Sequence, residues 1–215
     1  MSQKPKKGLF ITLEGIEGAG KSTIMPFIQT WLSQQKIAHK TTREPGGTLV
    51  AESIRQLFLT HHEEAMSSDT ELLLIFAGRA QHLFHFIIPH LNNGDWVISD
   101  RFTDASYAYQ GGGRGIALSR IAQIESWVQR GLKPDQIIVL DVPVKLAMLR
   151  IQQREHMDRI EQEKSTFFER ARQVYLTRAA QDPERYSIIA ATDSIEKVCS
   201  QVESILTTLW QKWAQ

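Results

Sequence analysis

Cysteine is almost absent from this sequence, because Cys199 is the single one among 215 residues. One cysteine excludes a disulfide within the chain and a cysteine-rich metal cluster. Cys199 borders an apolar stripe in the last predicted helix, so we expect a small packing residue rather than a reactive thiol. The seven histidines lack the neighbouring ligands of a metal site and are expected on the surface or in the core.

An excess of charge of either sign is also missing. The chain has 25 Lys plus Arg and 24 Asp plus Glu. A general electrostatic binder of nucleic acid would show a clear basic excess, so we expect no nucleic-acid partner. Any bound anion must then be held by a few placed arginines and by backbone amides.

Long apolar runs, repeats and low-complexity linkers are lacking as well. The basic residues 1–8 precede a short apolar run that is too short for a signal peptide or a membrane span. We therefore expect a cytoplasmic protein with no membrane partner, folded as a single domain over residues 1–215.

Strand-like and helix-like segments alternate along the chain, which predicts an α/β protein with a mostly parallel sheet. Two apolar runs end in an aspartate, as expected of buried parallel strands whose carboxyl ends face a ligand. The expected strands lie at 8–13, near 37–42, and at 95–100, 136–141 and 186–191. Helices are expected around 24–32 and at about 69–91, 118–130, 164–181 and 194–213. Together these elements predict a three-layer fold, a five-stranded parallel sheet flanked by helices.

A glycine-rich loop follows the first strand. Residues 15–22 match G-x-x-x-x-G-K-S in full, after a strand and before a helix. The glycines let backbone N–H groups face an anion, Lys21 reaches the β- and γ-phosphates, and Ser22 can ligate Mg²⁺. This predicts the P-loop NTPase fold with bound ATP and Mg²⁺. The residues assigned to ATP are Gly15, Ile16, Glu17, Gly18, Ala19, Gly20, Lys21, Ser22 and Thr23.

The loop alone does not name a function, because motors, switches and kinases share it. A kinase that phosphorylates a hydroxyl needs a base. A kinase whose acceptor is already a phosphate instead needs arginines around two polyanions.

Four further segments, in order after the loop, resemble the bacterial thymidylate kinase family. They are "TREPGG" (42–47), "DRF" (100–102), "YQGGGRG" (109–115) and "DRIEQE" (158–163). The resemblance runs from about residue 8 to the C-terminal helix. It implies transfer of the γ-phosphoryl group of ATP to dTMP, giving dTDP, in a homodimer. The apolar turns of the helix at 69–91 suit such an interface, but they would equally suit a monomer core.

The resemblance also assigns residues to the acceptor. Arg101 would hold the acceptor phosphate, and Asp100 would order the Mg²⁺ shell with Ser22. Arg79 would read the thymine carbonyl, and Tyr109 would pack against the sugar. The remaining residues implied for the dTMP pocket are Arg43, Pro45 (a candidate cis peptide), Arg55, Ser106 and Gln110. The plainer alternatives are a capping aspartate beside a surface arginine at 100–101, a ligand-free turn at 43–47, and a solvated Arg55.

One position departs from the family pattern. Many relatives have a phenylalanine that stacks on thymine four residues before the base-reading arginine, whereas this chain has Ile75 there and Phe76 next to it. One residue is about 100° of helix rotation, so Phe76 is not a simple replacement. Both residues stay candidates for the base pocket.

The phosphate loop lacks the arginine that some relatives carry, because positions 16–19 read Ile-Glu-Gly-Ala. The polar segment 149–163 has little apolar periodicity and is predicted to be a mobile lid that supplies the missing charge. The catalytic residues expected are Lys21, Arg101 and, from the lid, Arg154 first and Arg150 second. Arg159 is a further lid arginine, and the alternative is a charged helix facing solvent.

Glu17 would repel phosphate if it pointed into the loop. We expect it to point toward the acceptor, where the resemblance implies a hydrogen bond from the sugar 3′-hydroxyl. The alternative is a solvent-exposed acid with no role.

Rival functions for the protein are a kinase for another deoxynucleoside monophosphate and, from a different class, a P-loop switch or ATPase. One methyl group gives only about 10–200-fold discrimination, so some use of dUMP is expected.

Overall fold

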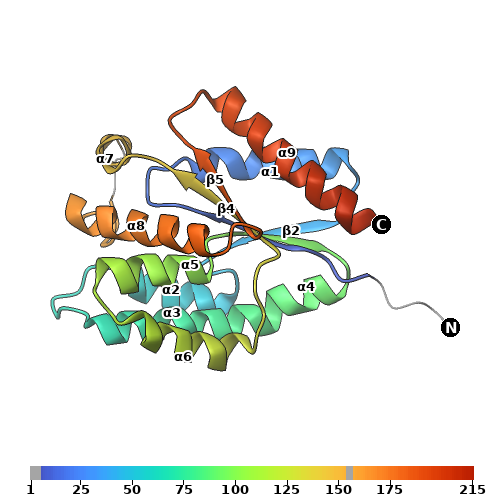
Figure 1. Cartoon of the computed structure of the whole chain (residues 1–215). Helices are drawn as coiled ribbons and strands as arrows, with labels where there is room; N and C mark the ends of the chain where they lie inside the picture. Colours follow the sequence, from blue (N-terminus) through green and yellow to red (C-terminus); the bar gives the residue numbers. More distant parts are fainter. Residues whose placement is uncertain (1–5, 154–156) are drawn as a thin grey trace.

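The computed structural model describes residues 6–153 and 157–215. All five described strands pair in parallel in the order β2-β3-β1-β4-β5 (Figure 1). The strands are β1 (Phe10–Glu14), β2 (His39–Arg43), β3 (Trp96–Asp100), β4 (Gln136–Asp141) and β5 (Tyr186–Ala190). The predicted five-stranded parallel sheet is confirmed, and the strand bounds differ from the predicted ones by at most two residues.

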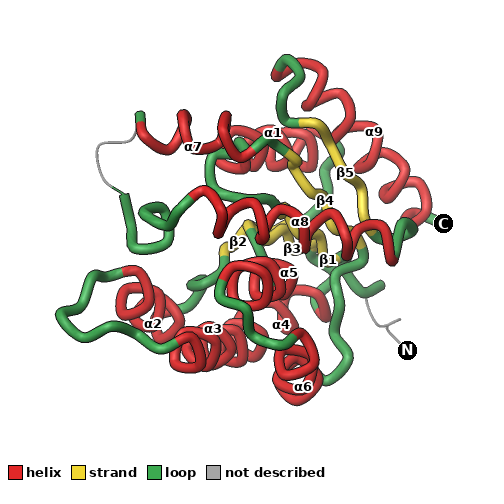
Figure 2. The backbone as a smooth tube through the Cα atoms, turned by 60° about the vertical axis from the view of Figure 1, so that its left-hand side comes forward, coloured by secondary structure: helices red, strands yellow, loops and turns green. Residues whose placement is uncertain are grey.

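Helices lie on both faces of the sheet. Figures 1 and 2 show α1 and α9 on one face and α3, α5, α6 and α8 across the other. The α-helices are α1 (Lys21–Gln34), α2 (Leu49–Leu59), α3 (Ser68–His82), α4 (Ile88–Asn92), α5 (Thr103–Ser106), α6 (Leu118–Gln129), α7 (Val144–Gln152), α8 (Ser165–Gln181) and α9 (Ile195–Ala214). Two π-helical segments, η1 (Leu83–Ile87) and η2 (Tyr107–Gly113), continue α3 and α5.

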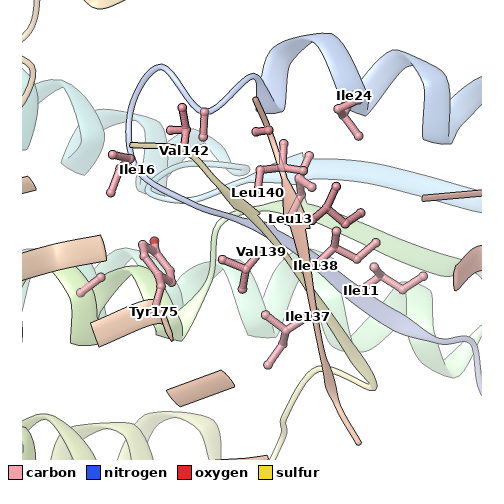
Figure 3. Packing of buried hydrophobic residues seen from close by; sticks show 14 of the residues in the cluster. Ile11, Leu13, Ile16, Ile24, Ile137, Ile138, Val139, Leu140, Val142 and Tyr175 are labelled. Carbon is pink, nitrogen blue, oxygen red and sulfur yellow. The ribbon is translucent and has the colours of Figure 1, made fainter. Parts of the chain in front are cut away.

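The core follows from the apolar runs of the central strands. Every residue of β1 is buried, and so are the first five residues of β4, as expected of strands covered on both faces. Ile11 and Leu13 of β1 pack with Ile138 and Leu140 of β4 beneath Ile24 of α1 (Figure 3). This packing holds the start of the glycine-rich loop in place.

The carboxyl ends of the strands meet at one edge of the sheet. Asp100 at the end of β3 lies opposite Leu13 of β1 and opposite Arg43 of β2. Three segments predicted to bind ligands therefore begin at one edge, which is where open parallel sheets place their sites.

The helix predicted at 69–91 is continuous from Ser68 to Asn92 but contains the π-helical segment η1. This stretch is long and apolar enough to cross a membrane, a test that core helices of globular proteins also pass. Here its first part, α3, packs against α2 and α6.

The predicted lid, residues 149–163, begins inside a helix. Its first residues, 149–152, form the last turn of α7, whose buried positions are Val144, Ala147 and Ile151. Two of these three buried positions precede residue 149, so the segment 149–163 by itself shows no helical apolar spacing. Arg154, the first candidate for catalysis, lies outside the described residues.

Candidate active site

The phosphate loop connects β1 to α1 in the conformation that its glycines predict. Gly18 has a φ of 74°, and a Cβ there would lie 2.5 Å from the carbonyl oxygen of Ala147 on α7. Only glycine fits such a left-handed, close-packed position. Ile16 and Ala19 point into the hydrophobic core, so only their backbone is available to a ligand. Gly18, Gly20, Lys21, Ser22 and Thr23 line a cavity, here called the phosphate-loop cavity.

Lys21 is folded back over its own loop. Its Nζ donates to the carbonyl oxygens of Gly15 at 3.0 Å and Ile16 at 3.2 Å. Burial, with the nearby charge of Arg101, lowers the pKa of Lys21 to about 8. An anion in the loop would favour the charged form of this lysine.

Arg101 follows β3 with a φ of 72°, a conformation that non-glycine residues seldom adopt. Such strain is found mainly at functional sites. The turn directs the guanidinium to the phosphate loop, where it donates to the Gly15 carbonyl and, at 2.6 Å, to Glu17 Oε1.

Glu17 is held between two donors. Besides Arg101, the hydroxyl of Tyr109 donates to Glu17 Oε2 at 2.5 Å. Burial raises the pKa of Glu17, but the charges of Arg101 and Lys21 and the Tyr109 hydrogen bond outweigh it and bring that pKa below its usual value. Glu17 is therefore an anionic side chain turned toward Tyr109.

A second cavity adjoins the phosphate-loop cavity, and both are lined by Glu17, Arg55 and Arg101. The predicted residues that line the second cavity are Glu17, Pro45, Arg55, Ile75, Arg79, Arg101, Ser106, Tyr109 and Gln110. They come from six separate segments of the chain. The Glu44–Pro45 peptide bond is cis, as predicted.

Two predicted residues lie elsewhere. Arg43 lines the phosphate-loop cavity and pairs with Glu52 at 3.0 Å. Phe76 is buried among Leu72, Tyr107, Ile116 and Ile121 and does not line the second cavity. This corrects its assignment to the base pocket. The physical reason is the helical rotation of about 100° per residue, which leaves Ile75 on the cavity side.

Arg79 crosses the buried end of the second cavity. Its Nε donates to Glu44 Oε2 at 2.7 Å, and its Nη2 donates to Ser106 Oγ at 3.0 Å. Phe76 packs on the guanidinium with its ring centre 4.5 Å away. Among the described residues, Arg79 Nη1 is buried without a hydrogen-bond partner.

Glu44 was predicted only as part of the turn at 43–47 and without a role of its own, and His82 was not predicted to be part of the site. Glu44 Oε1 is 3.0 Å from His82 Nδ1, and His82 Nε2 is 2.7 Å from Thr42 Oγ1. Burial raises the pKa of Glu44, but Arg79 and His82 outweigh it, so this pKa lies below its usual value. The "TREPGG" segment contains Glu44 and is the sequence feature that could have predicted its place in the site. No motif near His82 in the sequence predicts its place there.

Glu14 was not predicted to be part of the site either. It ends β1 and accepts hydrogen bonds from Phe102 N at 2.7 Å and from the Tyr175 hydroxyl at 2.9 Å. Burial, with the nearby Asp104, raises the pKa of Glu14 to about 8. Glu14 thus fixes the residue that follows Arg101.

The arginines of the predicted lid region diverge. Arg150, on α7, donates to the carbonyl oxygens of Gly18 at 3.0 Å and Ala191 at 3.2 Å. Arg159 stands between Asp158 and Ile160, which line the second cavity. Its Nη1 is 2.8 Å from Glu71 Oε2, and its Nε donates to the Phe58 carbonyl.

Two residues fit a magnesium ion. Asp100 Oδ1 is buried and has no hydrogen-bond partner among the described residues. Ser22 lines the same cavity. Mg²⁺ is usually bound by one or two protein oxygens together with substrate phosphates and water, and these two side chains match that need.

Comparison with known proteins bears on the whole chain. A sequence model described as thymidylate kinase matches residues 13–202. The thymidylate kinase of Vesicomyosocius okutanii is 52% identical over 204 residues, covering 95% of this chain and 100% of that protein. The enzyme of Marinomonas sp. is 50% identical over 208 residues, covering 97% and 98%.

A solved structure agrees. The crystal structure of thymidylate kinase from Ehrlichia chaffeensis superposes with a TM-score of 0.75 at 32% identity, covering 94% of this chain and 99% of that one. With the parallel sheet and the phosphate loop, this confirms the predicted fold class. The chain belongs to the thymidylate kinase family.

Proposed function

We propose that this protein transfers the γ-phosphoryl group of ATP to dTMP, giving dTDP and ADP. The observation that carries the proposal is the position of the Glu17–Arg101 pair, which lies on the walls of both cavities. A phosphate in the loop and a monophosphate in the second cavity would therefore meet at Arg101. Nucleotide kinases need this arrangement, and a switch or ATPase does not.

The acceptor phosphate is an oxyanion at neutral pH, so no base is required. The obstacle is the repulsion between two polyanions, which placed cations offset. Lys21 and the loop amides would hold the donor phosphates, and Arg101 and Arg55 would hold the acceptor phosphate. Arg150, already at the loop, and Arg154 would face the transferring group, where an arginine can contribute about 10³–10⁵ in rate.

Ser22 and Asp100 would hold Mg²⁺, which supplies positive charge beside the β- and γ-phosphates. Glu17 and Tyr109 would contact the sugar of the acceptor, with the Glu17 carboxylate accepting from the 3′-hydroxyl. Its hydrogen bond to Arg101 would link the position of the sugar to the position of the acceptor phosphate.

The test is ADP formation with MgATP alone and with dTMP, dUMP, dCMP, dGMP or dAMP added separately. We expect strong turnover with dTMP, weaker turnover with dUMP and almost none without acceptor. Hydrolysis of ATP that does not depend on an acceptor would refute the kinase assignment in favour of an ATPase or switch. If another monophosphate is the preferred acceptor, the proposed mechanism stands but the proposed acceptor, dTMP, is wrong.

A matched pair of variants sharpens this test. Arg101→Met should lower kcat/KM for dTMP by roughly 10²–10³-fold, the usual effect of removing one charge-stabilising donor. Arg120→Met removes an exposed arginine that pairs with Asp69 on the surface and should leave kcat/KM unchanged.

We also propose that two copies of the chain pair through an outer helical face, defined by the exposed apolar residues Leu73, Phe84 and Ile88. Leu73 and Phe84 are eleven residues apart, close to three helical turns, and so share one side of the continuous helix. Exposed apolar residues gathered on one face are typical of protein interfaces. The absence of a nucleic-acid partner remains a prediction from the balanced charge, and a cytoplasmic location remains a prediction from the short apolar run that follows residues 1–8.

A further inference from the structure

Glu71 lies in the first turn of α3 and was not predicted to have a role. Its side chain is buried, and it accepts hydrogen bonds from two residues of other segments and forms an ion pair with a third. Gln110 Nε2 donates to Glu71 Oε1 at 2.8 Å, and Arg114 Nε donates to both carboxylate oxygens at 3.2 and 3.3 Å. Arg159 Nη1 is 2.8 Å from Glu71 Oε2.

This contact decides which way the Gln110 amide faces. A carboxylate between two guanidinium groups accepts hydrogen bonds and offers no proton, so only the NH₂ group of Gln110 can face it. The carbonyl oxygen must then point away from Glu71. Gln110 lines the second cavity, and its Oε1 is buried without a partner among the described residues.

Arg79 supplies the complementary group. Its Nη1 is also buried and unpaired within the described part of the chain, and Arg79 lines the same cavity. The cavity therefore presents one hydrogen-bond acceptor, on Gln110, whose orientation is set by Glu71. It also presents one donor, on Arg79, whose orientation is set by Glu44 and Ser106. A ligand that carries an N–H beside a carbonyl oxygen could satisfy both.

The pyrimidine bases differ on this edge. Thymine and uracil carry an imide N–H next to a carbonyl oxygen, which matches the donor and acceptor of the cavity. Cytosine carries a ring nitrogen that accepts and an amino group that donates, so it would oppose both. A site whose buried polar groups are left unpaired by an analogue can reject it by about 10⁴–10⁵-fold.

We propose that Glu71 is a positioning residue that fixes Gln110 as a hydrogen-bond acceptor and thereby selects imide pyrimidines over cytosine. The inference rests on the proposed transfer to a pyrimidine monophosphate. Through Arg159, the same carboxylate also holds the segment containing Asp158 and Ile160, both of which line the cavity. Glu71 thus contacts both the residue that faces the base and the segment that forms another wall of the cavity.

The test is Glu71→Gln, with kcat/KM measured for dTMP, dUMP and dCMP by ADP formation. A carboxamide both accepts and donates, so Gln110 could turn its NH₂ group toward the cavity. The ratio of kcat/KM for dTMP to kcat/KM for dCMP should fall roughly 10–100-fold. The corresponding ratio for dTMP and dUMP should stay at its original value, because thymine and uracil both carry the imide. A merely structural defect would lower kcat/KM for all three substrates equally and would overturn the proposal.

Asp69→Asn is the matched control. It makes the same change of carboxylate to carboxamide on the same helix, at an exposed residue that pairs only with Arg120 in the described structure. It should leave both ratios and the activity with dTMP unchanged.

Gln110→Leu removes the acceptor itself and keeps the test decisive if Glu71→Gln does not fold. It should lower the dTMP-to-dCMP ratio at least as far, and the double variant should lower it no further, because both changes act through one hydrogen bond. An unchanged ratio in Gln110→Leu, or full additivity in the double variant, would overturn the role of Glu71. A wild-type protein inactive with every monophosphate would instead refute the proposed function.

Discussion

At the scale of single residues, Lys21 makes nucleotide binding depend on pH. Its pKa is lowered to about 8 by burial and by the charge of Arg101. Above that pH the lysine of the free protein is neutral, and binding of phosphate must be accompanied by uptake of a proton. The Kd of MgATP should therefore rise by up to about tenfold per pH unit above pH 8.

Titration of a fluorescent ATP analogue from pH 6.5 to 9.5 would measure this change. Lys21→Arg is the control, because an arginine stays charged over the whole range. We expect a flat profile for this variant, whatever its affinity. A flat profile for the wild-type protein would show that Lys21 is not the titrating group.

Glu14 makes the folded state itself sensitive to pH. Its pKa is about 8 in the folded chain and 4.5 in the reference state, because of burial and the nearby Asp104. A group with a raised folded pKa contributes its full stability below pH 4.5 and loses it as the pH rises toward 8. Glu14→Gln cannot ionise, so its free energy of unfolding relative to wild type should rise by about 1.4 kcal/mol per pH unit across that window.

Urea unfolding at pH 5, 7 and 9 would test this expectation. The control is Glu203→Gln, which changes an exposed glutamate on α9 and should not alter the pH dependence. Parallel curves for wild type and Glu14→Gln at all three pH values would contradict the assignment.

At the scale of elements, the contact between the phosphate loop and α7 positions Arg150. A Cβ on Gly18 would lie 2.5 Å from the Ala147 carbonyl oxygen, whereas a Cβ on Gly20 would meet no atom within 4 Å. Both glycines have positive φ, so both alanine variants are strained, but only Gly18→Ala also forces α7 away. We expect it to lose roughly 2–4 kcal/mol of stability, against about 1–2 kcal/mol for Gly20→Ala.

Thermal unfolding of the two variants without nucleotide gives this comparison directly. Equal losses would mean that backbone strain alone matters and that α7 can move freely. The contact also explains why the lid was hard to delimit from sequence. The turn 149–152 is polar on its outer side and is held by buried residues that precede it.

Helix α3 shows how far a local pattern reaches. Its apolar spacing predicted a helix, and the family resemblance implied a base-reading role for Arg79. Which neighbour of Arg79 lines the cavity was left open between Ile75 and Phe76. The packing of Phe76 against Tyr107 and Ile121 decides it, and those partners are more than 30 residues away in sequence.

At the scale of the whole molecule, the outer helical face predicts a dimer. Phe84 is 72% exposed and Leu73 is 59% exposed, although both belong to the apolar stretch of one continuous helix. Phe84→Glu would place a charge in the proposed interface, where desolvation opposes it. We expect this variant to be monomeric by light scattering coupled to size exclusion, while the wild-type protein is a dimer.

Trp127→Glu provides the comparison. Trp127 is 79% exposed on α6, outside the outer helical face, and its replacement should leave the dimer intact. A monomeric wild-type protein, or a dimer that survives Phe84→Glu, would refute the interface.

The sequence by itself determined the phosphate loop, the parallel strands and the family. These depend on local chemistry, since glycine spacing, a lysine before a helix and apolar runs closed by aspartate act within a few residues. Only the tertiary structure decided that Glu71 meets Gln110, Arg114 and Arg159, and that Glu14 supports the turn at Arg101. Such contacts join segments that are dozens of residues apart, and they exist because sheet order and helix packing bring buried charges together, which no local pattern encodes.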